Sequence, residues 1–220
     1  MTVGALVPAA GLGVRLGPGV PKALRLLRGE PLLVHAVRGL RAVAAVGPVV
    51  VAAPAAELAD VRALLAAYDV GVIAGGAERS DSVAAALAAL PPEVDLVLVH
   101  DAARCLTPPA VVLAVVEALR AGAPAVVPVL PVHDTVKRVE GDRVVETVPR
   151  AHLRAVQTPQ GFARAVLRRA HEGPGDRHTD DAGMVEALGL PVVTVPGSEE
   201  AFKVTRPLDL LLAEAVLGAR

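Results

Sequence analysis

The sequence predicts an α/β fold, a doubly wound, mostly parallel, Rossmann-like sheet with helices on both faces. Apolar runs of strand length alternate with longer segments of helical period, and the first four runs are almost wholly apolar, as strands buried on both faces of a parallel sheet are. A chain of 220 residues suits a single domain with a substantial core, so we expect one domain over 1–220. The expected strands occupy residues 3–8, 49–53, 70–74, 94–100, 125–130 and 192–196.

The segments between these runs carry helix start signals. Pro31 precedes LLVHAVRGLRAV, and Ser80 with Asp81 precedes an alanine-rich helix. Thr107 followed by Pro108 is typical of an N-cap with proline at the first helical position. Strand and helix therefore alternate as βαβ units, which favours parallel strands joined by helices.

Residues 131–149 break this alternation. The stretch PVHDTVKRVEGDRVVETVP alternates apolar and polar residues around Glu140-Gly141-Asp142, which predicts a β-hairpin. A two-stranded hairpin is marginally stable alone, so it should pack on another surface, and we favour a second copy of the chain over the chain's own body. We expect a protruding β-arm over 131–154 that makes a homodimer.

Composition and charge exclude several classes of protein. The formal net charge is -1 and tryptophan is absent, which argues against a nucleic-acid-binding or membrane-surface protein. No apolar run is long enough to span a membrane and the start lacks a signal-peptide pattern, so we expect a cytoplasmic protein. Cys105 is the only cysteine, which excludes an internal disulfide.

The stretch PAAGLGVRLGPGVPK follows the first expected strand. In a doubly wound sheet this connection is the usual phosphate site, because backbone N–H groups converge there. Leu16 stands where a dinucleotide fingerprint needs glycine, and the segment is no P-loop. Arg15 and Lys22 add two cations that can reach different oxygens of a polyphosphate, whereas a purely structural turn needs fewer glycines and no cations. We therefore predict a polyphosphate site.

The stretch VHDAARC places Asp101 directly after the fourth apolar run. Asp101 should then lie at the same sheet edge as the first loop, where it could hold Mg²⁺ against phosphate oxygens or simply cap a turn. Arg104 would face the anionic end of a second substrate, with a surface arginine as the alternative.

Two other stretches carry candidate binding residues. In GGAERSDSV, Gly75 and Gly76 allow close backbone approach, and Ser80, Asp81 and Ser82 could bind a base or ribose. An ordinary N-cap would also explain the stretch. Lys203, in FKVTRPLDL before a helix expected from Pro207, is one of only three lysines, which argues mildly against a merely solvated side chain.

The stretch HEGPGDRHTDD clusters His171, His178, Asp180 and Asp181, but their spacing fits no helical pair of metal ligands. Thr179 with Asp180 is instead typical of a helix cap, with Asp181 next in the chain, so we do not assign a metal to this cluster.

The motifs PAAGxGxR…PK, GGxxRxDSV, VHDAAR, DTVKR, TPQ and KVTRPxDL occur in an order that resembles the 2-C-methyl-D-erythritol 4-phosphate cytidylyltransferase family. The similarity covers essentially the whole chain, and DTVKR with KVTRPxDL is its most specific part. The resemblance implies a homodimeric enzyme of the nucleotidyltransferase fold that joins CTP and methylerythritol phosphate, with release of pyrophosphate, in non-mevalonate isoprenoid biosynthesis. It also implies Mg²⁺ or another divalent cation as cofactor.

The resemblance also implies roles for individual residues. Arg15 and Lys22 would stabilise the transition state at the α-phosphate, and Asp101 would carry the metal. Thr135 and Arg150 would reach from the arm into the partner's site. The catalytic residues would be Arg15, Lys22, Arg150 and Lys203. The residues that bind CTP would be Pro8, Ala9, Ala10, Gly11, Gly13, Gly75, Gly76, Ser82 and Asp101. The residues that bind the second substrate would be Asp101, Arg104, Thr135, Arg150, Thr158, Thr179 and Lys203.

Two alternative functions stay open on the sequence alone. A cytidylyltransferase that acts on ribitol 5-phosphate would share the chemistry and most motifs. A non-catalytic nucleotide-binding protein could keep the glycine-rich loop, but it would have little reason to keep Arg15, Lys22 and Asp101 together.

Overall fold

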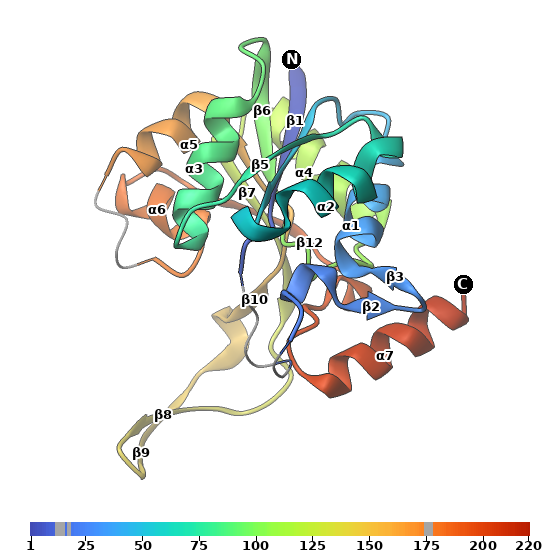
Figure 1. Cartoon of the computed structure of the whole chain (residues 1–220). Coiled ribbons are helices and arrows are strands. Elements are labelled where there is room, and N and C mark those ends of the chain that lie inside the picture. The colour runs from blue at the N-terminus through green and yellow to red at the C-terminus, as the bar shows by residue number, and fades with distance from the viewer. Residues whose placement is uncertain (12–15, 17–18, 174–177) are drawn as a thin grey trace.

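An eight-stranded sheet runs through the body of the protein (Figure 1). The computed structural model describes residues 1–11, 16, 19–173 and 178–220. The strands of this sheet are β1 (Thr2–Pro8), β4 (Val49–Ala53), β5 (Gly71–Ala74), β6 (Val94–Val99), β7 (Ala125–Pro131), β10 (Arg154–Val156), β11 (Gln160–Ala163) and β12 (Val193–Pro196).

The strand order is β10-β7-β11-β6-β1-β4-β5, with β12 paired to β7. β1 pairs in parallel with β4 and β6, β4 with β5, and β7 with β12. Only β10 and β11 run antiparallel to their neighbours in this described sheet. The predicted doubly wound, mostly parallel sheet is therefore confirmed, and all six apolar runs form strands.

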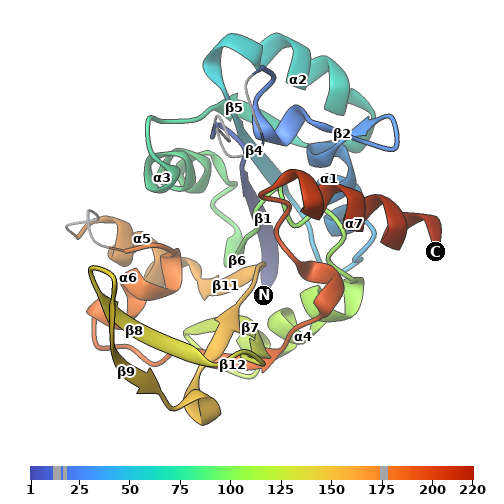
Figure 2. The same cartoon turned by 90° about the horizontal axis from the view of Figure 1, so that it is seen from below.

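Helices cover both faces of the sheet, as Figure 2 shows. Along β1, Val3, Ala5 and Val7 face one layer while Leu6 faces the other, because side chains alternate along a strand. The first layer contains α1 (Leu32–Arg41), α2 (Leu58–Leu65) and α4 (Pro109–Arg120). The second layer contains α3 (Arg79–Ala89), α5 (Arg164–His171) and α6 (Asp181–Ala187).

A third, smaller apolar cluster joins the C-terminal helix α7 (Pro207–Gly218) to a short hairpin of β2 (Leu26–Leu27) and β3 (Glu30–Pro31). Helix α7 begins at Pro207, as the sequence predicts. Cys105 is buried in this cluster as a free thiol. None of the helices in the described part of the chain has the length and apolar character of a membrane span.

Two predicted helix starts differ from the structure. Helix α4 begins at Pro109, and Pro108 takes the N-cap position in an extended conformation, because a residue before proline avoids the helical region. The Thr107 hydroxyl therefore donates to the carbonyl of Arg104 in a turn instead of capping the helix. Helix α3 begins at Arg79 and so includes Ser80 and Asp81, which were expected to precede it, because Asp81 accepts a hydrogen bond from the amide of the N-cap residue Glu78 at 3.0 Å.

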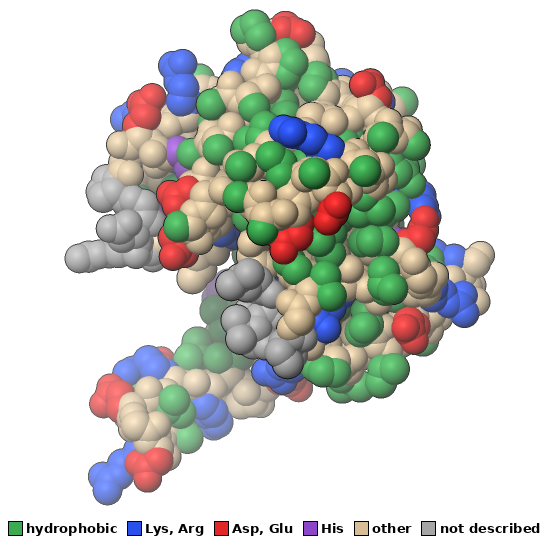
Figure 3. Space-filling model, viewed as in Figure 1, with side chains coloured by type: hydrophobic (Ala, Val, Ile, Leu, Met, Phe, Trp, Pro, Cys, Tyr) green, Lys and Arg blue, Asp and Glu red, His purple; other side chains and the backbone are tan. Residues whose placement is uncertain are grey.

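The β-arm is a two-stranded antiparallel sheet of its own, made of β8 (Val136–Glu140) and β9 (Arg143–Val148). Its cross-strand contacts include a hydrogen bond of 3.0 Å from Arg138 to Glu146. Pro131 and Arg154 pair across β7 and β10 and so close the base of the arm. Figure 3 shows the arm as a separate projection beside the body of the molecule.

Candidate active site

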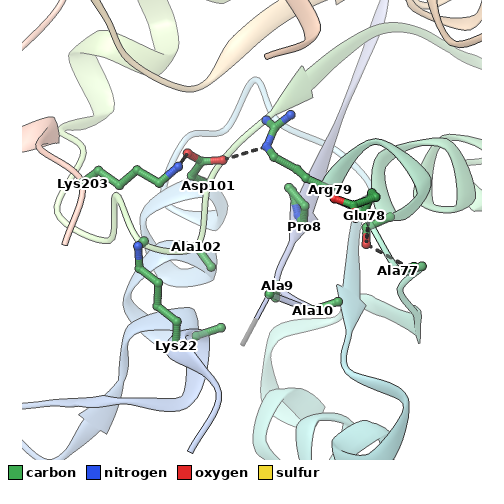
Figure 4. A pocket seen from close by; sticks show the side chains of 15 residues that line it. Pro8, Ala9, Ala10, Lys22, Ala77, Glu78, Arg79, Asp101, Ala102 and Lys203 are labelled. Carbon is green, nitrogen blue, oxygen red and sulfur yellow. Dashed lines mark hydrogen bonds and ion pairs between the residues drawn. The ribbon is translucent and has the colours of Figure 1, made fainter. Parts of the chain in front are cut away.

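A pocket opens at the carboxyl ends of β1, β5 and β6 (Figure 4). This is where doubly wound sheets bind their ligands, because loops that follow neighbouring parallel strands meet there. Its wall combines small residues with a few charged ones. The lining residues are Pro8, Ala9, Ala10, Gly11, Lys22, Ala23, Gly76, Ala77, Glu78, Arg79, Ser82, Asp101, Ala102, Ala103 and Lys203.

Asp101 follows β6 and lies between two cations. Lys203 Nζ lies 2.7 Å from Asp101 Oδ2, and Arg79 Nε lies 3.3 Å from Asp101 Oδ1. Figure 4 shows the two cationic side chains reaching Asp101 from opposite sides. Burial raises the pKa of Asp101, but the charges of Arg79 and Lys203 outweigh burial and hold this pKa well below its usual range. Asp101 is therefore ionised at neutral pH.

The loop after β5 packs tightly against the loop after β1. A Cβ added at Gly75 would lie 2.6 Å from the Cβ of Ala10 and 2.8 Å from Ser82 Oγ, so glycine is needed for this approach. Ser82 is buried in the first turns of α3, where its hydroxyl accepts from the Gly76 amide and donates to the Glu78 carbonyl. The two hydrogen bonds of Ser82 therefore hold the loop after β5 against α3, and Ser82 does not cap the helix.

Lys22 lines the pocket from a 3-10 helix, Lys22–Leu24, that follows the glycine-rich stretch. It shares the pocket with Pro8, Gly11 and Asp101, as the sequence predicts for the polyphosphate site. Gly13 and Arg15, the other two predicted residues of this stretch, lie outside the described residues.

Two predicted residues lie beneath the pocket instead of lining it. Arg104 donates hydrogen bonds to the carbonyls of Ala201, at 2.7 Å, and Val156, at 3.1 Å, so its guanidinium ties separate segments together. The Thr158 hydroxyl accepts from the Asp101 amide at 3.1 Å and lies 3.1 Å from Nδ1 of His100. Both residues support the loop that carries Asp101.

The remaining predicted residues lie farther from the pocket. Thr179 is exposed and lines a neighbouring hollow that shares Glu78 and Arg79 with the pocket. Thr135 and Arg150 are exposed near the base of the arm and are absent from the pocket lining in a single chain. Their predicted contact with a partner's site stays a prediction.

The cluster in HEGPGDRHTDD is organised by helix capping and charge pairing. Asp180 caps α6 by accepting from the Gly183 amide at 3.0 Å, as predicted. Asp181 accepts from His171 Nε2 at 3.0 Å and from Arg79 Nη1 at 2.6 Å. In the described part of the chain, no group of three or more His, Cys, Asp and Glu side chains could hold a metal ion.

Arg79 and Asp181 are functional candidates that the sequence reasoning missed. Arg79 lies within GGAERSDSV, so the sequence already indicated that it lies at the sheet edge. The glycines and the residues from Ser80 to Ser82 were chosen as binding candidates, and Arg79 was not. Its pairing with Asp181 joins residues 102 positions apart, which no local pattern in one sequence reveals.

Comparisons with known proteins agree with the motif order. Residues 3–219 match the family model of 2-C-methyl-D-erythritol 4-phosphate cytidylyltransferase. The relative of that name from Streptomyces avermitilis is 60% identical, with 98% of this chain and 92% of the relative covered. Another relative of that name, from Frankia casuarinae, is 61% identical over 98% of this chain and 81% of the relative.

Solved structures show the same fold. The crystal structure of 2-C-methyl-D-erythritol 4-phosphate cytidylyltransferase from Thermus thermophilus is 40% identical, with a TM-score of 0.81 over 98% of both chains. The crystal structure of 4-diphosphocytidyl-2C-methyl-D-erythritol synthase from Anaerococcus prevotii is 26% identical, with a TM-score of 0.86 over 99% of this chain and 98% of the other. With its pocket of paired charges at the sheet edge, this chain therefore belongs to the 2-C-methyl-D-erythritol 4-phosphate cytidylyltransferase family of nucleotidyltransferases.

Proposed function

We propose that this protein transfers the cytidylyl group of CTP to 2-C-methyl-D-erythritol 4-phosphate, a step of isoprenoid biosynthesis. The products are 4-diphosphocytidyl-2-C-methyl-D-erythritol and pyrophosphate. The observation that carries the proposal is the pocket at the ends of β1, β5 and β6, where Arg79 and Lys203 flank Asp101 and Lys22 lines the same wall, in a chain of this family. Fixed cations of this kind can bring two phosphate-bearing substrates together.

The reaction is a substitution at phosphorus. An oxygen of the acceptor's phosphate attacks the α-phosphorus of CTP and forms the new P–O bond. The bond from that phosphorus to the bridging oxygen of the β-phosphate breaks, and pyrophosphate leaves with the electron pair. A phosphate monoester is already anionic at neutral pH, so the enzyme needs no general base. Its task is to position two anions and to neutralise charge that builds on the transferred group.

The pocket residues divide this task. The backbone of residues 8–11, with Gly76 and Ser82, offers close approach to the nucleotide because the neighbouring side chains are small. Lys22 is suited to neutralise phosphate oxygens, together with Arg15 of the same stretch, which lies outside the described residues. Lys203 borders the pocket beside Asp101, where the acceptor's phosphate would meet a second cation.

We further propose that Mg²⁺ binds with the nucleotide at Asp101. Protein-bound Mg²⁺ commonly takes one or two carboxylates plus substrate phosphates and waters, so the carboxylate of Asp101 in a polyphosphate pocket fits. When bound, the ion would neutralise phosphate charge. Lys203 and Arg79 hold the two oxygens of Asp101, and the Lys203 side chain is the more exposed partner, at 40% against 30%. Lys203 is therefore the partner that a phosphate can draw away most easily.

We also propose that the enzyme is a homodimer built through the arm. Val139, Val144 and Val145 of the arm are 56%, 60% and 42% exposed, and apolar side chains on a two-stranded sheet need a partner surface. In such a dimer Thr135 and Arg150, which are exposed near the base of the arm, would contact the partner's pocket.

A substrate panel tests the proposed reaction. The purified protein is incubated with Mg²⁺, CTP and one polyol phosphate, and pyrophosphate release is measured while the product is identified by mass. We expect release with CTP and 2-C-methyl-D-erythritol 4-phosphate, and little with erythritol 4-phosphate, ribitol 5-phosphate or other nucleoside triphosphates. Faster turnover of ribitol 5-phosphate would reassign the acceptor. Binding of CTP without pyrophosphate release from any acceptor would rule out catalysis.

Complementation between inactive chains tests the shared site. Arg150→Ala and Lys22→Ala chains are each inactive in this scheme, but a mixed dimer has one intact site of two. Half of the dimers in an equilibrated equal mixture are mixed, so about a quarter of the wild-type activity should return. No recovery, in a mixture shown to exchange subunits, would mean that Arg150 serves its own chain.

A further inference from the structure

We propose that Asp181, supported by His171, is a positioning residue that fixes the guanidinium of Arg79 against Asp101 in the active site. The inference rests on the proposed function, since it assigns a role in that same reaction. It concerns a buried side-chain array behind the pocket, which runs from α5 through α6 to the first residue of α3.

Arg79 bridges two carboxylates with different nitrogens. Its Nε faces Asp101 Oδ1 at 3.3 Å, and its Nη1 donates to Asp181 Oδ2 at 2.6 Å. A planar guanidinium held at two nitrogens by fixed acceptors has one orientation, whereas an arginine held at a single point can rotate about its long side chain. The contact with Asp181 is the shorter one and comes from outside the pocket lining, so it acts as the anchor.

Asp181 is itself held in place by burial and by a second hydrogen bond. Its side chain is 0% exposed, and its second oxygen accepts from His171 Nε2 at 3.0 Å, where the His171 side chain is 7% exposed. Burial raises the pKa of Asp181, but the hydrogen bond from His171 and the charge of Arg79 hold it below its usual value. Burial of an unpaired carboxylate costs desolvation free energy, so both of its oxygens need partners. Here one oxygen of Asp181 pairs with Arg79, a cation of the pocket, and the other pairs with His171.

The surroundings explain why Arg79 needs this anchor. The pocket and the neighbouring hollow share Arg79, whose side chain is 30% exposed. Without Asp181, the guanidinium could turn from Asp101 toward that hollow. Asp101 would then keep only Lys203, the partner that a substrate phosphate competes for. Asp181 therefore keeps one cation on Asp101 while Lys203 is engaged elsewhere.

The adjacent acid provides a matched control. Asp180 precedes Asp181 in the chain, but its carboxylate accepts from the Gly183 amide and from Gln160, and no contact with Arg79 is seen in the described structure. Asp180→Asn and Asp181→Asn make the same chemical change one residue apart. Asparagine is also a good N-cap, so the first variant should preserve the helix.

A double-mutant cycle tests the proposal. The proteins compared with wild type are Asp181→Asn, Arg79→Gln, the double variant and Asp180→Asn. For each we measure kcat, KM for each substrate and, by calorimetry, CTP affinity, and all values are normalised to the concentration of folded protein. We expect Asp181→Asn to lower kcat by about 10-fold to 100-fold, as misplacement of a site group does. In the Arg79→Gln background the same change should alter kcat by less than about 2-fold, because its effect passes through Arg79.

Other readouts separate positioning from a merely structural role. CTP affinity should stay within about 2-fold of wild type, because the nucleotide side of the pocket is mostly backbone. Asp180→Asn should leave kcat unchanged, and His171→Gln should lower it less than Asp181→Asn does. Equal losses from Asp181→Asn in both backgrounds, or equal losses from the two acid variants, would overturn the proposal. An inactive wild-type protein would instead overturn the proposed function.

Discussion

Lys203 Nζ and Asp101 Oδ2 lie 2.7 Å apart and join the segment before α7 to the loop after β6. Two hydrogen bonds hold this junction: the Val204 amide donates to the Ala103 carbonyl at 2.9 Å, and the Arg104 guanidinium donates to the Ala201 carbonyl at 2.7 Å. The C-terminal segment is thus fastened to the sheet edge, so Lys203 enters the pocket from a part of the chain far from the glycine-rich stretch.

Replacement of Lys203 by alanine should impair catalysis far more than folding. We expect kcat/KM for the acceptor to fall by on the order of 10², as after loss of a fixed electrostatic donor. The free energy of unfolding should fall by about 1 kcal/mol or less, because the side chain is 40% exposed and Asp101 keeps Arg79. Steady-state kinetics and urea unfolding measure the two quantities. Lys203→Arg should recover part of the activity, and full activity of Lys203→Ala would remove this lysine from the mechanism.

Replacement of Lys22 by alanine should lower kcat by on the order of 10² or more, because a fixed positive charge at the phosphate site is lost. Lys22 lines the pocket from a short 3-10 helix and is only partly buried, so the fold should stay intact. Turnover under saturating CTP, with circular dichroism as the folding control, tests this. Near-normal turnover would show that Lys22 is not needed for the chemical step.

The sheet could be predicted from the sequence because its signal is local. Each strand is a short apolar run, and burial between two helical layers requires that pattern at every position. The start of α4 was predicted one residue early, since the Thr107-Pro108 pattern suggested a cap while Pro109 keeps Pro108 extended. The strands β10 and β11, which run antiparallel to their neighbours, are too short to show a strand pattern of their own in the sequence.

The candidate site could be predicted only where its residues follow strands. Pro8, Gly11 and Asp101 were expected at one edge of the sheet, and they line one pocket there, because the ends of parallel strands meet at one edge. Arg104 was predicted to face a substrate, but its hydrogen bonds to carbonyls of two distant segments depend on the tertiary structure. The Arg79–Asp181 pair was missed for the same reason, because an ion pair between helices far apart in the sequence produces no recognisable motif.

Gly11, which lines the pocket, and Gly75, which lies outside the lining next to Gly76, should separate folding from nucleotide binding. A Cβ at Gly11 would meet no atom of the described residues within 4 Å, so Gly11→Ala should change the free energy of unfolding by less than about 0.5 kcal/mol. Gly11 lines the pocket, however, so the added methyl group should raise KM for CTP by about 10-fold or more. Thermal unfolding and CTP titration of the variant test both statements.

Gly75→Ala is the matched variant with the opposite expectation for folding. Its Cβ would lie 2.6 Å from the Cβ of Ala10, so the two loops must shift, at a cost of about 1–3 kcal/mol. A Gly75→Ala protein as stable as wild type, or a Gly11→Ala protein with normal CTP affinity, would contradict the packing described for this pocket.

His100 should make the stability of the protein depend on pH. Its side chain is almost fully buried beneath the pocket, and burial, with a smaller contribution from the charge of Arg104, lowers its pKa from 6.5 to about 4, although Asp101 opposes the shift. Between pH 6.5 and about pH 4, the His100 side chain is protonated in the unfolded chain but stays neutral in the folded protein. The contribution of His100 is therefore fully present above about pH 6.5 and is lost as the pH falls toward 4, by about 3 kcal/mol in total.

Urea unfolding of wild type and His100→Gln between pH 7.5 and pH 4.5 tests this expectation, and the variant acts as its own reference at pH 7.5. Glutamine can still bond to the Thr158 hydroxyl, which lies 3.1 Å from His100 Nδ1, but it does not titrate. The pKa of Asp101 is shifted below its usual range, so its contribution is lost only at lower pH and adds no slope in this window. The wild-type stability should therefore fall more steeply with acidification than that of His100→Gln. Parallel curves of unfolding free energy against pH for the two proteins would show that His100 titrates normally in the folded state. The His100 side chain would then be accessible to water, and not buried as described.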